Sequence, residues 1–244
     1  MPAETRSLES TVVAVTGASA GIGRATARLL VEAGAKVAVT ARREERLIEL
    51  ENELGSDSLV WVAGDIADAA TNTQLVEKAL AAFGRLDSFV ASAGIGMYGG
   101  IVDGSDDDMQ TMIDTNFTGT VFGVRSVVPT FVAAGGGDIV IVTSVAGIRG
   151  GADEAVYAGT KAAQLIFAGA VDRELRESGI RVTALCPAAV STEFAIGRGR
   201  TAGDAWLDDV LTAEDVAGSI LFTLQQPRRV RTTQVTMWSA AQAS

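Results

Sequence analysis

The sequence lacks histidine altogether and has one cysteine and four prolines among its 244 residues. Without histidine, no histidine general base or histidine metal site is possible. Cys186 alone can neither close an intrachain disulfide nor form a cysteine cluster for a metal. We therefore expect no metal site, and any chemistry must use Ser, Tyr, Lys, Asn, Asp, Glu or a cofactor.

The sequence also lacks long apolar runs and an excess of basic residues. No apolar stretch approaches the roughly 18 residues of a membrane span, and the N-terminal MPAETRSLES has no signal-peptide pattern. The 20 Lys and Arg against 30 Asp and Glu give a net charge of −10, which disfavours nucleic acids and anionic membranes as partners. We expect a cytoplasmic protein that binds neither.

Short apolar runs rich in β-branched residues alternate with longer amphipathic stretches along the chain. The runs predict strands at 11–16, 36–40, 59–63, 86–92, 138–144, 180–186 and 233–237. The stretches between them predict helices at 22–33, 44–54, 72–83, 106–134, 154–178 and 213–224.

Continuous apolar strands separated by helices are typical of a parallel sheet with both faces covered. The expected fold is therefore α/β, a single-domain doubly wound (Rossmann) fold with about seven parallel strands and helices on both faces. No linker interrupts 1–244, in which we expect an N-terminal arm at 1–10 and a substrate loop at 189–210. The alternation alone also permits a closed eight-stranded barrel.

The motif TGASAGIG at 16–23 decides between these folds, because it lies between the first strand and the first helix. Gly17, Gly21 and Gly23 allow a pyrophosphate to approach the backbone at the positive end of a helix, and Ser19 adds a hydroxyl. An ordinary glycine-rich turn is the alternative, but the position after the first strand favours a dinucleotide.

The residues after the second strand indicate which nucleotide is bound. An acidic residue there would bind a ribose 2′-hydroxyl, but the chain has Ala41, Arg42 and Arg43. Because a guanidinium matches a phosphate, we predict NADP(H) in preference to NAD(H). The alternative is that both arginines pair with acids of the next helix: Glu44, Glu45 or Glu49.

The segment YAGTK places Tyr157 and Lys161 one turn apart on a predicted helix. A neighbouring ammonium favours a phenolate, so this tyrosine could exchange a proton near neutral pH. Ser144 ends the fifth predicted strand, at the sheet edge where such folds bind ligands. Together these residues predict a site that protonates a carbonyl oxygen.

With these motifs in order, the sequence resembles the compact branch of the short-chain dehydrogenase/reductase family from about Thr11 to about Thr192. The matching positions are TGASAGIG, Asp65, SAG at 92–94, Asn116, Ser144, Tyr157, Lys161 and Pro187. The resemblance implies that the cofactor contacts Gly17, Ser19, Gly21, Ile22, Gly23, Arg42, Arg43, Asp65, Ile66, Ser92, Ala93, Gly94, Tyr157, Lys161, Pro187, Val190 and Thr192.

The resemblance also implies the catalytic roles. Tyr157 would be the general acid/base, and Ser144 would polarise the carbonyl. Lys161 would lower the tyrosine pKa and bind the nicotinamide ribose. Asn116 would hold a water that links Lys161 to solvent, and Asp65 would face the adenine. From the residues alone, Asn116 could equally be a satisfied polar residue in a helix, and Asp65 an N-cap or turn residue.

Two motifs depart from the family pattern. Ala91 and Ser92 replace two asparagines of the family's NNAG, and Ala188 replaces the glycine after Pro187. Neither change removes a proton-transfer group. The complete set Asn116, Ser144, Tyr157 and Lys161 therefore argues against a relative that only binds the cofactor.

We expect the substrate at three loops, 95–100, 145–151 and 189–210. Candidate wall residues are Met97, Tyr98, Ile148, Phe194 and Trp206, and Arg149 is a candidate for an anionic group or a solvated side chain. The apolar helices at 106–134 and 154–178 predict a homo-oligomer, tetramer or dimer.

The predicted function is an NADP(H)-dependent carbonyl reductase or alcohol dehydrogenase. The alternatives are a related epimerase, dehydratase or enoyl reductase, and a non-catalytic protein that senses NADP(H).

Overall fold

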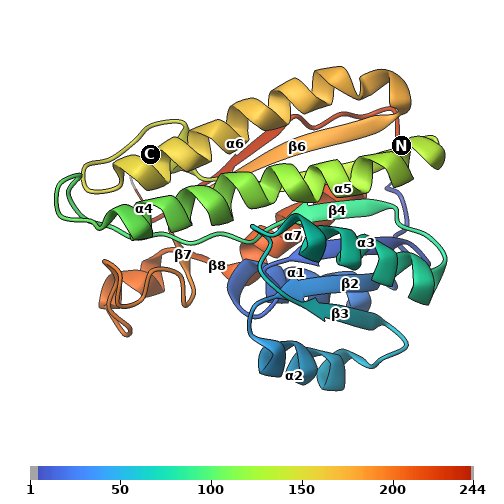
Figure 1. Ribbon diagram of the computed structural model, residues 1–244, viewed down its shortest axis with the longest axis horizontal. Coiled ribbons are helices and arrows are strands. Elements are labelled where there is room, and N and C mark those ends of the chain that lie inside the picture. Colours follow the sequence, from blue (N-terminus) through green and yellow to red (C-terminus); the bar gives the residue numbers. More distant parts are fainter. Residues whose placement is uncertain (1–4, 243–244) are drawn as a thin grey trace.

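The computed structural model describes residues 5–242 and shows one seven-stranded sheet with helices on both sides (Figure 1). The strand order is β3-β2-β1-β4-β5-β6-β9, and every neighbouring pair is parallel. The strands are β1 (Val12–Thr16), β2 (Lys36–Ala41), β3 (Leu59–Ala63), β4 (Ser88–Ala91), β5 (Gly137–Val142), β6 (Ile180–Pro187) and β9 (Gln234–Met237). The order reverses between β1 and β4, as in a doubly wound sheet, so the predicted fold class is confirmed.

The alternation of side chains along each strand divides the core between the two faces of the sheet. Val13 and Val15 of β1 pack with α1 (Gly21–Glu32), α2 (Glu44–Leu54) and α7 (Ala213–Leu224). Val12 and Ala14 pack on the other face, with α3 (Ala69–Phe83), α5 (Gly119–Ala133) and α6 (Ala155–Glu174). Both faces are thus buried, which explains why the strands read as continuous apolar runs.

The predicted helix at 106–134 is interrupted. It consists of α4 (Asp106–Ile113), a π-helical turn (Asp114–Thr118) and α5. The wide turn contains Asn116, whose side chain bonds outside the helix instead of facing solvent.

Other boundaries also differ from the prediction, two of them where a side chain caps the following helix. The fifth strand ends at Val142, since the Ser144 hydroxyl caps a short 3-10 helix at Val145–Gly147. Asp68 caps α3, which begins at Ala69, three residues before the predicted start. The helix predicted to run to Ser178 ends as α6 at Glu174 and is followed by a 3-10 turn at Arg176–Ser178.

The predicted substrate loop, 189–210, is closed by a strand pair that the sequence pattern did not indicate. Parallel strands β7 (Val190–Ser191) and β8 (Leu211–Thr212) close the loop at its base. Between them lies a 3-10 helix at Ala205–Asp209.

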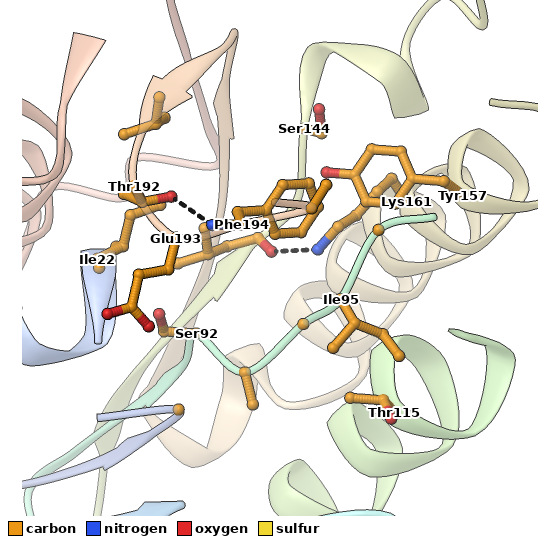
Figure 2. A pocket seen from close by; sticks show the side chains of 18 of the residues that line it. Ile22, Ser92, Ile95, Thr115, Ser144, Tyr157, Lys161, Thr192, Glu193 and Phe194 are labelled. Atoms are coloured by element: carbon orange, nitrogen blue, oxygen red, sulfur yellow. Dashed lines mark hydrogen bonds between the residues drawn. The ribbon is translucent and has the colours of Figure 1, made fainter. Parts of the chain in front are cut away.

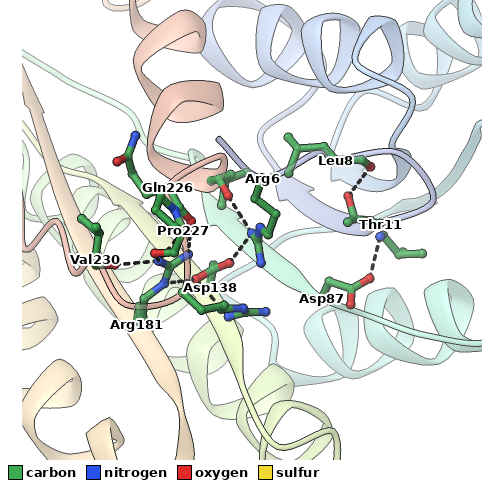
Figure 3. Close-up of polar contacts among 12 residues, drawn as sticks. Arg6, Leu8, Thr11, Asp87, Asp138, Arg181, Gln226, Pro227 and Val230 are labelled. Atoms are coloured by element: carbon green, nitrogen blue, oxygen red, sulfur yellow. Dashed lines mark hydrogen bonds and ion pairs between the residues drawn. The ribbon is translucent and has the colours of Figure 1, made fainter. Parts of the chain in front are cut away.

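The predicted N-terminal arm packs against the domain over its described part, while residues 1–4 lie outside the described residues. Leu8 is 2% exposed within the core, and Arg6 forms an ion pair of 2.6 Å with Asp138 (Figure 3). In residues 5–242, no helix combines the length and apolarity that a bilayer crossing requires.

Candidate active site

A cavity of about 1040 Å³ opens at the carboxyl ends of the strands (Figure 2). All the residues predicted to contact the cofactor line it: Gly17, Ser19, Gly21, Ile22, Gly23, Arg42, Arg43, Asp65, Ile66, Ser92, Ala93, Gly94, Tyr157, Lys161, Pro187, Val190 and Thr192. Ser144 also lines it, whereas Asn116 does not. The structure therefore gathers these residues around one space large enough for a dinucleotide.

The glycine loop leaves no room for a side chain at Gly17. Gly17 has a φ of +74°, and a Cβ there would lie 2.7 Å from the Ala93 Cα. The Thr16 hydroxyl accepts the backbone N–H groups of Ser92 and Ala93, at 3.1 Å each. This contact anchors the segment in which the family's two asparagines are replaced. No side chain caps the N-terminus of α1, so its free N–H groups are available for a phosphate.

The two arginines after β2 differ in their partners. Arg43 donates to the Ser19 hydroxyl at 3.1 Å and forms an ion pair with Glu193 at 2.9 Å. Arg42 is exposed at the cavity, and no carboxylate within residues 5–242 forms an ion pair with it. Neither arginine pairs with the helix acids that the alternative interpretation named. The acid that does pair, Glu193, lies on the predicted substrate loop and was not singled out from the sequence.

Asp65 behaves as a turn residue and also lines the cavity. Its carboxylate accepts the backbone N–H of Ala67 at 2.9 Å. Asp68, not Asp65, is the N-cap of α3.

Tyr157 lies on α6 with its ring between two other aromatic rings, 6.0 Å from Tyr98 and 5.6 Å from Phe194. It is 7% exposed, and burial raises the pKa of its hydroxyl well above the ordinary value. Tyr98 adds to this shift and Ser144 opposes it. The phenol thus holds its proton firmly at the cavity wall.

Lys161 is also buried, and its ammonium has only neutral acceptors. Nζ donates to the Val142 carbonyl at 3.0 Å and to Gln164 Oε1 at 2.9 Å. Burial lowers the pKa of Lys161 to about 7. In this arrangement burial dominates the pKa of Tyr157, and the Lys161 ammonium points to Val142 and Gln164. The role of Lys161 in lowering the tyrosine pKa stays a prediction.

Asn116 lies behind the cavity wall. Its side-chain amide bonds to the N–H and C=O of Ile95 at 2.8 and 2.9 Å, and also to Thr160. The Asn116 carbonyl accepts from Gln164 Nε2 at 2.8 Å. Gln164 therefore links Lys161 directly to Asn116. The water that the family resemblance implies between Lys161 and solvent stays a prediction.

The substrate end of the cavity agrees with the sequence prediction at most positions. Met97, Tyr98, Phe194 and Arg149 line it. Ile148 and Trp206 do not: they are 50% and 43% exposed, so their assignment as wall residues was wrong. Lining residues that sequence reasoning missed include Asp108, Thr111, Thr115, Glu154, Arg198, Arg200 and Trp238.

The chain is similar in sequence to known dehydrogenases and oxidoreductases. The family model described as short chain dehydrogenase matches residues 11–202. An uncharacterized oxidoreductase of Staphylococcus aureus is 32% identical over 230 residues, which cover 94% of this chain and 97% of the relative.

Solved structures are similar over nearly the whole chain. The closed form of a serine dehydrogenase complexed with NADP+ has 32% identity and a TM-score of 0.89, covering 96% of this chain and 97% of that one. A 3-ketoacyl-(acyl-carrier-protein) reductase of Brucella melitensis complexed with NADH has 27% identity and a TM-score of 0.88, covering 96% and 99%.

Proposed function

The chain belongs to the short-chain dehydrogenase family, and from this premise we propose that it is an NADP(H)-dependent oxidoreductase acting on a carbonyl or alcohol. The observation that carries the proposal is the placement of Tyr157, Ser144 and Lys161 on one cavity wall beside the glycine loop.

The residues of the cavity fit a dinucleotide. The glycine loop and the uncapped N-terminus of α1 would hold the pyrophosphate, and Lys161 the nicotinamide ribose. Asp65 and Ile66 would lie at the adenine. When bound, the nicotinamide supplies or accepts the hydride.

The preference for NADP(H) depends on Arg42. Of the two structures compared above, one holds NADP+ and the other NADH. Arg42 supports the phosphate-bearing form, because its guanidinium is exposed at the cavity without an ion-pair partner in the described chain, and a guanidinium binds phosphate well.

The chain's own residues handle the proton. During reduction, the Tyr157 phenol donates its proton to the substrate oxygen, and during oxidation the phenolate takes it back. The Ser144 hydroxyl donates a hydrogen bond to the same oxygen, which strengthens as negative charge develops there. Because Gln164 and Val142 take two of the Lys161 donors, the third remains for the ribose.

The test is a panel of carbonyl compounds with the absorbance of NADPH as the signal. It should include 3-oxoacyl thioesters, steroids, sugars, aromatic ketones and small aldehydes, with the oxidation of alcohols by NADP+ alongside. For any compound that reacts, Tyr157→Phe should lower kcat by about 10²–10⁴-fold, because general acid/base catalysis typically contributes that much. Because the variant keeps the ring between Tyr98 and Phe194, NADPH affinity should fall much less than kcat.

The same experiment separates the alternatives. NADPH binding with no turnover of any carbonyl or alcohol would favour a cofactor-sensing protein. A Tyr157→Phe variant with full activity would exclude the proposed proton transfer, and would leave a related family reaction to be tested.

We also propose that the chain forms a homo-oligomer through the outer faces of α5 and α6. Val132 on α5 and Ile166 on α6 are 49% and 74% exposed, and burial of such side chains stabilises association.

A further inference from the structure

The charged residues at the substrate end of the cavity are not evenly matched. Arg198 forms an ion pair with Asp108 at 2.9 Å. The Glu154 carboxylate accepts the backbone N–H of Gly151 at 2.7 Å. Arg200 has no ion-pair partner among residues 5–242, although it is half-buried and lines the same cavity. With Arg149, which lines the same end, three guanidinium groups thus face two carboxylates, and Arg200 is the half-buried one that forms no ion pair in the described chain.

Aromatic rings surround the Arg200 guanidinium. Its Cζ lies 5.3 Å from the ring centroid of Phe194, 5.4 Å from that of Trp206 and 5.9 Å from that of Tyr98. Rings at these distances attract a cation and fix its position. They also displace water around it, which strengthens its attraction for an anion.

The backbone of the loop holds Arg200 in this place. Its N–H donates to the Ala195 carbonyl at 3.1 Å, and its carbonyl accepts from Gly197 at 2.8 Å. In the side chain, Nη1 donates to the Val190 carbonyl at 3.0 Å. A guanidinium has five N–H donors, so most of them remain for a ligand in the cavity.

Arg200 lies close to the residue that transfers the proton. Phe194, which contacts Arg200, has its ring centroid 5.6 Å from that of Tyr157. Burial raises the pKa values of Tyr98 and Tyr157; the Arg200 charge opposes both shifts and the Glu154 charge adds to both, as expected for opposite charges near the two hydroxyls. A small substrate can therefore reach both Arg200 and Tyr157.

We propose that Arg200 binds a carboxylate of the substrate, so that the substrate class is a short hydroxy acid or the corresponding oxo acid. The inference rests on the proposed oxidoreductase function and names its substrate. The chain as a whole carries a charge of −10 and repels anions, so binding of an acid requires a local unpaired cation. A planar guanidinium matches a carboxylate with two parallel hydrogen bonds.

The test compares acids with neutral analogues of the same carbon skeleton. Short 2- and 3-hydroxy acids and their methyl esters are oxidised with NADP+ by the wild type, Arg200→Gln and Arg200→Lys. The wild type should prefer an acid, and Arg200→Gln should lower kcat/KM for it by about 10- to 100-fold, as expected for loss of hydrogen bonds to a charged group. The ester should change less than about threefold by the same reasoning. Arg200→Lys, which keeps the charge but not the fork, should fall between.

Arg149→Gln is the matched comparison. Arg149 also lines the cavity, with its guanidinium 4.7 Å from the ring centroid of Trp238. If Arg149→Gln removes the preference for acids and Arg200→Gln does not, the assignment to Arg200 is wrong. Equal kcat/KM for acid and ester in the wild type would also overturn it.

A binding measurement separates this inference from the proposed function. Quenching of tryptophan fluorescence in the NADP+ complex is titrated with a non-reactive carboxylate, such as propionate, and with its methyl ester. Propionate binding that Arg200→Gln abolishes would support the carboxylate site even if no alcohol in the panel reacts. Turnover of neutral alcohols without propionate binding would support the oxidoreductase and exclude the carboxylate site. An unchanged affinity for NADPH confirms that each variant is folded.

Discussion

The two ends of the parallel sheet hold buried charge in opposite ways. At the amino end, Asp138 is 4% exposed and meets Arg181 at 2.7 Å, Arg6 at 2.6 Å and Arg228 at 3.4 Å (Figure 3). At the carboxyl end, Lys161 is equally buried but is bonded to a carbonyl and an amide, with no carboxylate.

The paired charges at the amino end stabilise the fold, whereas the unpaired groups at the carboxyl end are suited to catalysis. The paired charges at the amino end connect distant parts of the chain: Arg181 also donates to the carbonyls of Gln226, Pro227 and Val230. The carboxyl end leaves a lysine with a pKa near neutrality and a tyrosine that keeps its proton. Groups with shifted pKa values in a cavity are suited to proton transfer, whereas saturated ion pairs are not.

The largest effect on stability is expected at the amino end. Asp138→Asn leaves buried arginine charge without a carboxylate, which typically costs about 3–5 kcal/mol. Urea unfolding should show this loss, while kcat should not change because the site lies at the other end of the sheet.

Glu53→Gln is the control for this variant. Glu53 pairs with Arg24 and Arg28 at the surface, where its side chain is 37% exposed, so its loss should cost less than about 1 kcal/mol. If Asp138→Asn costs no more than Glu53→Gln, the cluster does not have the proposed structural role.

A smaller effect of opposite sign is expected for Lys161→Met. In the folded protein the pKa of Lys161 is about 7, below its ordinary value of 10.5. Below pH 7 the lysine is charged in both the folded and the unfolded state. The free-energy cost of burying the charged ammonium is then at its largest. Between the two values only the unfolded state binds the proton, so wild-type stability rises with pH. Lys161→Met should therefore be more stable than the wild type at pH 6, by on the order of 2 kcal/mol, and the gain should shrink by pH 9.

Urea unfolding without nucleotide at the two pH values measures this change. Lys36→Met serves as the control, because Lys36 donates to the Asp57 carbonyl at an exposed site. A gain from Lys161→Met that is the same at both pH values would show that its burial does not shift its titration.

The sequence predicts those parts of the site that depend on local geometry. The turn after β1 needs glycines where a phosphate approaches the backbone. A spacing of four residues on one helix puts Tyr157 and Lys161 on the same face. The sheet could be predicted because strands buried on both faces read as continuous apolar runs.

Contacts between distant segments could not be predicted in this way. Glu193 is 150 residues from Arg43, and only the fold brings them together. Ile148 and Trp206 were misassigned because the packing of a loop decides whether its side chains point into the cavity or to solvent. Gln164 could have been found, since it lies three residues after Lys161 on the same helix.

The smallest expected effect is that of Arg42→Ala on the choice of cofactor. It follows from comparing an arginine at each end of the sheet. Arg181 at the amino end is saturated by acceptors, whereas Arg42 at the carboxyl end has no ion-pair partner in residues 5–242. If Arg42 binds the 2′-phosphate, Arg42→Ala should weaken NADPH binding by about tenfold, or ~1.4 kcal/mol, and leave NADH binding unchanged. Titration of both reduced cofactors measures this. Arg28→Ala, which removes only a surface pair with Glu53, should alter neither affinity. An unchanged preference for NADPH in Arg42→Ala would show that an unpaired arginine at this edge does not by itself mark a phosphate site.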